Sequence, residues 1–136
     1  MIRWRLLVAE AALLLLAARL LVASLRLGRW RRWLGPVATA ATAGIASDHD
    51  RLLAKAVDRA TLRLPGQSKC LPRAMALHWM LARRGRGAQL VIAVLPGAAR
   101  GGLDDLHAWV EAGDEVLIGA LDQPFRPLAR FGWQRL

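Results

Sequence analysis

The sequence contains a single cysteine, and it has no long uninterrupted run of apolar residues. One cysteine cannot form an internal disulfide, so folding does not depend on an oxidising compartment, and a cytoplasmic location is expected. The longest apolar run, Ala11–Ala18, has eight residues, well short of the roughly 20 that a membrane-spanning helix needs. We therefore expect residues 1–34 to form an apolar, arginine-edged helix that packs on the rest of the domain, with peripheral contact to a membrane or a partner as the alternatives.

The motifs of several other classes of site are also missing. No second cysteine and no pair of histidines at ligand spacing is present, so no metal site is expected. The glycine-rich segment 97–102 follows a proline and lacks the Lys-Ser/Thr of a P-loop, so no cofactor is expected to bind directly. The formal net charge of +10 is concentrated in residues 1–35, where seven arginines oppose one glutamate. Because that segment is otherwise heavily apolar, it favours packing or lipid over nucleic acid.

The order of the expected elements is helices first and then a small antiparallel sheet, which is an α+β fold. Residues 35–47 are rich in Ala, Thr and Gly and are interpreted as a connector, and residues 48–136 as the core. Helices are expected over 48–62, after a cap at Ser47–Asp50, and from Cys70 to about Arg83. Strands are expected over 89–95, 106–112 and 115–118, and residues 122–136 are expected to be irregular, with a last short strand or edge cover. The expected inward positions of the first of these helices are Leu52, Leu53, Ala56, Val57 and Ala60.

The chemistry of a thiol nucleophile is suggested by Cys70 and His107. Cys70 opens a predicted helix, where unpaired N–H groups favour a thiolate, although a lone cysteine is also a common core residue. His107 lies 37 residues further on, at the start of a predicted strand with Trp109 and Glu111 on the same face. A nucleophile and its base need this arrangement, near in space and distant in sequence. His78 is eight residues along the helix from Cys70, about 12 Å away, which is too far for a hydrogen bond.

A third group should orient the histidine, and a further donor should stabilise the oxyanion. Asp122, which lies 15 residues after His107, is the first candidate for the orienting group. Asp114, Asp104 and Asp105 are alternatives, and each of the four is by default a solvated loop carboxylate. The backbone N–H of Cys70, with the side chain of Gln67, is the candidate oxyanion site.

Four segments together resemble the cysteine-peptidase domain that removes the leader from lasso-peptide precursors, a branch of the transglutaminase-like, papain-like fold. They are Cys70-Leu71-Pro72-Arg73-Ala74-Met75-Ala76-Leu77, Leu81-Ala82-Arg83-Arg84-Gly85, Gln89-Leu90-Val91-Ile92-Ala93-Val94 and His107-Ala108-Trp109-Val110-Glu111. The resemblance covers residues 67 to about 128 and implies a Cys–His–Asp triad, with Cys70 and His107 as its first two members. Where many members carry an Asn-Asp pair, this chain has Ile118-Gly119, so the resemblance leaves the aspartate open between Asp122, another aspartate and none.

The resemblance also implies partners. It suggests a split system in which a separate protein recognises the leader of a precursor peptide, this chain removes the leader, and an ATP-dependent cyclase closes a macrolactam. Any dependence of cleavage on ATP would come from a partner. Two alternatives remain open: an acyltransferase that uses the same triad, and a non-catalytic adaptor in the maturation complex.

Overall fold

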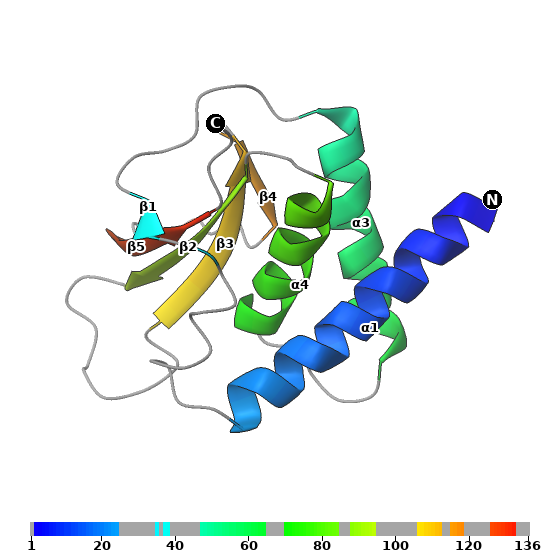
Figure 1. Cartoon of the computed structure of the whole chain (residues 1–136), viewed down its shortest axis with the longest axis horizontal. Coiled ribbons are helices and arrows are strands. Elements are labelled where there is room, and N and C mark those ends of the chain that lie inside the picture. The colour runs from blue at the N-terminus through cyan, green and yellow to red at the C-terminus, as the bar shows by residue number, and fades with distance from the viewer. Residues whose placement is uncertain are drawn as a thin grey trace.

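The computed structural model describes residues 2–24, 35, 37–38, 47–64, 70–84, 88–94, 106–112, 115–118 and 126–132 (Figure 1). Within these ranges the fold is α+β, as predicted: three helices lie against one antiparallel sheet. The helices are α1 (Ile2–Ser24), α3 (Asp48–Arg63) and α4 (Cys70–Arg83). The strands are β1 (Val37–Ala38), β2 (Gln89–Val94), β3 (Leu106–Ala112), β4 (Glu115–Ile118) and β5 (Arg126–Phe131).

The sheet has the order β1-β5-β2-β3-β4. Strands β2, β3 and β4 form the expected meander, because each pairs antiparallel with the next along the chain. The bounds of β3 and β4 agree with those expected from the alternation of apolar and polar residues. Strand β1 lies within the predicted connector and pairs with β5 at one edge of the sheet.

Strand β5 comes from the segment that was expected to be largely irregular. It pairs with β2 on one side and with the two-residue β1 on the other, so it lies inside the sheet and not only along its edge. Pro127 pairs with Ala93 beside a register shift between Ile92 and Ala93. Because proline has no N–H to donate to a ladder, a strand can accommodate it at such an irregularity.

The helices α3 and α4 form the layer next to the sheet. The expected cap of α3 is confirmed: the Ser47 hydroxyl accepts from the Asp50 N–H at 3.1 Å, and the Asp50 carboxylate accepts from the Ser47 N–H at 2.9 Å. Leu53, Ala56, Val57 and Ala60 are buried as predicted, but Leu52 is exposed, which corrects that part of the prediction. α4 packs against β2, β3 and β4, and Met75, Leu77, His78 and Leu81 on it are buried.

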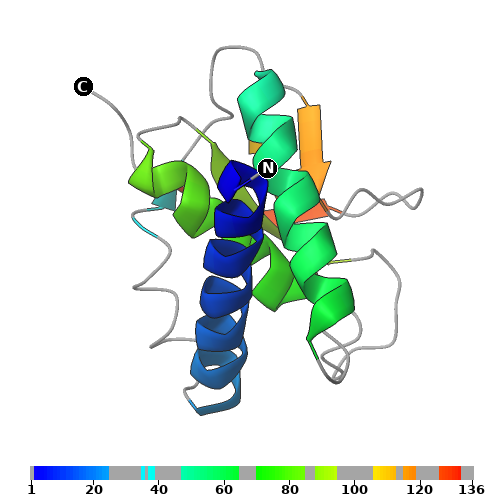
Figure 2. The ribbon, with the colours of Figure 1, turned by 90° about the vertical axis from the view of Figure 1, so that its right-hand side faces the viewer.

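Helix α1 lies outside α3 and α4, on the side away from the sheet (Figures 1 and 2). Its inner face joins the main core through small and medium-sized apolar side chains, which are Leu7, Val8, Ala11, Leu15 and Ala18. None of the helices in the described ranges is both long enough and apolar enough to cross a membrane.

Candidate active site

Cys70 is the first residue of α4, the position that the sequence predicted for it. The first turn of the helix contains no acidic residue, so no carboxylate within that turn neutralises the positive end of the helix dipole. Pro72, the third residue, is buried in that turn, where its missing N–H removes no helical hydrogen bond. The sequence therefore starts α4 at the cysteine, where the backbone N–H groups have no partner within the helix itself, an arrangement that favours a negative charge there.

His107 is the second residue of β3 and is half-buried. Alternation along the strand is as predicted: Ala108, Val110 and Ala112 join the core shared with the helices. Trp109 packs instead with Val91 and Ala93 in a separate cluster, on the opposite face of the sheet. Because His107 is directly opposite Ala93 in the register, it belongs to the face that carries Trp109.

The starts of α4 and β3 lie at the same end of the molecule (Figure 1). α4 is joined by residues 84–88 to the start of β2, and Gln89 there pairs with Glu111 near the end of β3. β3 is antiparallel to β2, and Figure 1 shows α4 running in the same direction as β3. Their lengths also match, about 21 Å for a 14-residue helix and about 23 Å for a seven-residue strand. The beginning of the helix thus lies level with the beginning of the strand.

The other predicted members of the site lie outside the described residues. These are Gln67, the oxyanion candidate, Asp122, the first candidate for the orienting aspartate, and its alternatives Asp104, Asp105 and Asp114. The structure therefore places the starts of the elements that carry Cys70 and His107 at the same end of the molecule, and the triad itself stays a prediction.

A polar network on the His107 face of the sheet was not anticipated from the sequence. The Trp109 indole N–H donates to Glu111 Oε1 at 2.7 Å, and Arg130 donates to Glu111 Oε2 at 2.6 Å. Gln89 is opposite Glu111 in the register, and its Oε1 lies 3.5 Å from Arg130 Nη1. Both partners of the ion pair are largely shielded from water, with side-chain exposures of 22% for Arg130 and 15% for Glu111. Because Arg130 is on β5, the pair bridges β5 and β3 across β2 and orients the indole two residues after His107.

The other two histidines stand apart from the start of α4. His78 is buried in the middle of the helix, and His49 is exposed near the start of α3. Within the described ranges, no group of three or more His, Cys, Asp or Glu side chains is arranged to hold a metal ion.

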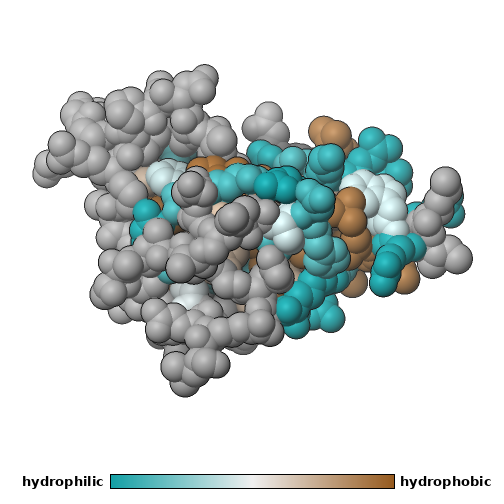
Figure 3. All heavy atoms as spheres, turned by 90° about the horizontal axis from the view of Figure 1, so that it is seen from above, coloured by the Kyte–Doolittle hydropathy of each residue, from teal (hydrophilic) through white to brown (hydrophobic). Residues whose placement is uncertain are grey.

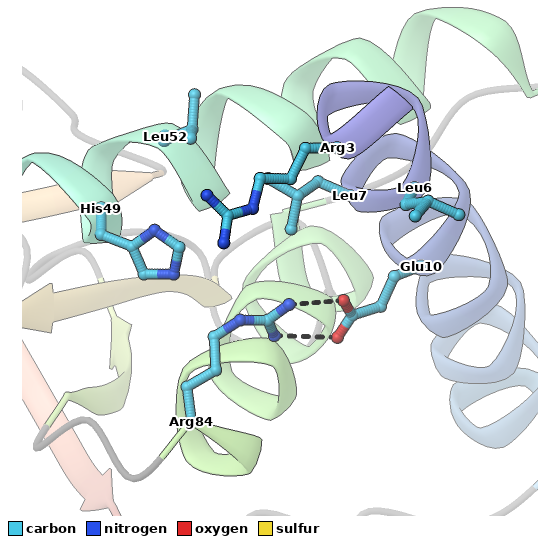
Figure 4. A pocket seen from close by; sticks show the side chains of 7 residues that line it. All are labelled: Arg3, Leu6, Leu7, Glu10, His49, Leu52 and Arg84. Atoms are coloured by element: carbon cyan, nitrogen blue, oxygen red, sulfur yellow. Dashed lines mark hydrogen bonds and ion pairs between the residues drawn. The ribbon is translucent and has the colours of Figure 1, made fainter. Parts of the chain in front are cut away.

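A pocket of about 460 Å³ opens between α1 and α3, close to the end of α4. Figure 4 shows that Arg84 and Glu10 meet within it through two hydrogen bonds, of 2.7 and 2.9 Å, while Arg3 extends toward His49. Arg83 also donates to Glu10, at 2.6 Å. Arg84 directly follows the last residue of α4, whereas Cys70 is the first, so this pocket lies at the far end of the helix from the cysteine. We assign it to the packing of the helices and not to the thiol chemistry.

The arginines at the pocket shift the pKa of Glu10. The hydrogen bond from Arg84 lowers the pKa of Glu10, and this effect outweighs the partial burial that would raise it. Glu10 therefore stays ionised and holds α1 against the end of α4.

The comparisons with known proteins agree with this architecture. A family model described as the transglutaminase-like superfamily matches residues 12–130, which is most of the chain. A search of curated proteins and a search of solved structures gave no significant match.

Proposed function

The chain belongs to the transglutaminase-like superfamily, and from this premise we propose that it is a cysteine peptidase with Cys70 as nucleophile and His107 as base. Cysteine peptidases and transglutaminases, which transfer acyl groups, are common in this superfamily. The observation that carries the proposal is that α4 and β3 start at the same end of the molecule. There, a helix that begins at the only cysteine is level with a strand that begins beside a histidine.

The proposed reaction follows the chemistry of an acyl-enzyme. The Cys70 thiolate attacks the scissile carbonyl carbon, and the Cys70 N–H at the helix start, with Gln67, donates to the oxyanion. The protonated imidazole of His107 gives its proton to the leaving amine as the C–N bond breaks, which leaves a thioester. His107 then takes a proton from water, the hydroxide attacks the thioester, and the thiolate leaves with a free carboxylate as the product.

The sheet geometry constrains how the histidine would act. His107 shares the sheet face of Trp109, which is opposite to the face packed by the helices. In the proposal, the imidazole therefore approaches the thiol around the start of β3 and not through the sheet. Its place as the second residue of the strand is compatible with this path. Asp122 is proposed as the group that orients the imidazole.

We further propose that the substrate is the precursor of a ribosomally made lasso peptide. The support for this substrate is the resemblance of the four segments that include Cys70–Leu77 and His107–Glu111 to leader peptidases. Under this proposal, a separate recognition protein holds the leader, this chain removes it, and a cyclase that uses ATP closes the released peptide. The chain itself would act without a bound cofactor.

Cleavage of the precursor in the presence of the recognition protein, followed by mass spectrometry, tests the proposal. We expect the wild type to release the leader with a gain of one water, and Cys70→Ala to lose this activity by at least about a thousandfold while it keeps its fold. His107→Ala should show a comparable loss. The exposed His49 supplies a matched control, since His49→Ala changes the same residue type away from the start of α4 and should retain activity.

The same experiment separates the alternatives. Cleavage by a folded Cys70→Ala variant would exclude the thiol mechanism. An amide product in the presence of added amines would identify an acyltransferase, which uses the same nucleophile and base. Absence of any product, from a wild-type protein that still binds the recognition protein, would favour a non-catalytic adaptor.

A further inference from the structure

Helix α1 carries a second apolar face, which points away from the core. Leu6, Leu13 and Leu20 are 63%, 69% and 67% exposed, and Leu16 is 40% exposed. Their spacings of seven, three and four residues place all four on one side of the helix. We call these four residues the leucine stripe. It is about 21 Å long at 1.5 Å per residue and lies opposite the face that joins the core.

The charged residues of α1 flank the leucine stripe. At the helical period, Arg5 and Arg19 fall along one edge of it, and Arg3 and Glu10 along the other. Glu10 is already occupied by Arg83 and Arg84. Among the described residues, Arg3 and Arg5 form no hydrogen bond or ion pair. Figure 3 shows the apolar and hydrophilic side chains next to each other on the side of the molecule formed by the helices.

We propose that the leucine stripe lies on an anionic lipid surface, with α1 parallel to the plane of the membrane. An exposed apolar stripe with arginines along both edges has the composition of an interfacial helix, in which the leucines enter the acyl region and the guanidinium groups reach the phosphates. In the sequence, Arg26, Arg29, Arg31 and Arg32 follow within eight residues of the end of α1, so the charge of this segment is complementary to anionic headgroups.

The charges also distinguish lipid from a second copy of the chain. Two leucine stripes in contact would bring the arginines of one copy close to those of the other, with no unpaired carboxylate on α1 to offset them. An anionic surface has no such conflict. This inference does not depend on the chemistry of Cys70.

Sedimentation of the full chain with vesicles tests the inference. We expect the wild type to sediment with vesicles of phosphatidylcholine and phosphatidylglycerol, to sediment much less with phosphatidylcholine alone, and to dissociate as salt is raised. The triple variant Leu6→Ser, Leu13→Ser, Leu20→Ser should bind at least about tenfold more weakly. Because these side chains are exposed, the variant should keep the circular dichroism spectrum of the wild type.

Two further variants complete the test, one as a control and one that removes charge. Leu62→Ser removes a leucine that is 78% exposed but lies at the end of α3, and it should leave vesicle binding unchanged. Arg3→Gln with Arg5→Gln should weaken binding to the anionic vesicles and reduce its dependence on salt. The inference is overturned if the wild type stays in the supernatant with anionic vesicles, or if the triple variant sediments as the wild type does. It is also overturned if the leucine stripe instead mediates a dimer or binds the recognition protein while the chain ignores vesicles.

Discussion

Single side chains decide how the candidate site is supported. Glu111 accepts from both Trp109 and Arg130, and it lies four residues along β3 from His107. That separation is about 13 Å, so Glu111 cannot hydrogen-bond the imidazole directly. Its role is to fix the indole and to add a side-chain link between β5 and β3, the strand that carries His107.

We expect Glu111→Gln to destabilise the protein by about 1–3 kcal/mol. The substitution keeps an acceptor for the indole but removes the charge that pairs with the largely shielded Arg130. The free energy of unfolding from urea titration measures the effect. Glu115→Gln on the neighbouring strand is the matched control, because its pair with Arg51 is more exposed and should matter less. Equal losses for the two variants would argue against a special role for the largely shielded pair of Glu111 and Arg130.

Among the elements, α1 and α4 are joined by apolar packing and by one carboxylate. Glu10 receives Arg84 in two hydrogen bonds and Arg83 in a third, although these arginines lie 73 and 74 residues away in the sequence. The side chain of Glu10 is 17% exposed, so water screens these pairs only in part. The pair between Arg73 and Asp58, which joins α4 to α3, is more exposed.

This link between helices predicts a dependence of stability on pH. Because the pKa of Glu10 is lower in the folded chain than its ordinary value of 4.5, its contribution is fully present above pH 4.5 and is lost as the pH falls through the lower folded value. Glu10→Gln should reduce the free energy of unfolding by about 1–3 kcal/mol at neutral pH. Urea titrations from pH 7 to pH 3 should then show the difference between wild type and variant shrinking below pH 4.5.

A matched variant tests whether burial gives Glu10 its importance. Asp58→Asn removes the more exposed pair with Arg73, and we expect a loss of no more than about 1 kcal/mol. A difference between wild type and Glu10→Gln that stays constant down to pH 3 would contradict the linkage.

In the whole molecule, one apolar core joins the helices to the sheet. Leu90 on β2 and Val110 on β3 are fully buried in the same cluster as Leu53 of α3, Met75 of α4 and Leu15 of α1. The layers therefore share their stability, and α4 with its terminal Cys70 is held between the sheet and the outer helix. A change deep in this core is expected to affect the entire fold.

We expect Leu90→Ala to destabilise the protein by about 2–5 kcal/mol, because it leaves a cavity where the sheet meets the helices. Thermal unfolding followed by circular dichroism and by tryptophan fluorescence should give one coincident transition at a lower temperature. Leu62→Ala, at a site that is 78% exposed, should change stability by no more than about 0.5 kcal/mol. Separate transitions for the two probes would show that the helices and the sheet unfold independently.

Local sequence indicated most of the elements and the starts of the two that carry the candidate site. The cap at Ser47 and the position of Cys70 marked the starts of two helices, and alternation marked β3 and β4. These features depend on neighbours a few residues apart, so the sequence carries them directly. It also indicated Cys70 and His107 as a pair, since helix and strand patterns located both.

Tertiary structure alone decided the features that join distant segments. Nothing local places β5 beside β2, because strand pairing depends on the packing of both strands and Pro127 argues against an interior strand. The partners of Glu10 and Glu111 were equally hidden, since charged residues far apart in sequence can pair in many ways. Helix α1 is apolar around most of its circumference, so its spacing could not indicate which leucines face the core; packing against α3 and α4 selected one face and left the leucine stripe exposed.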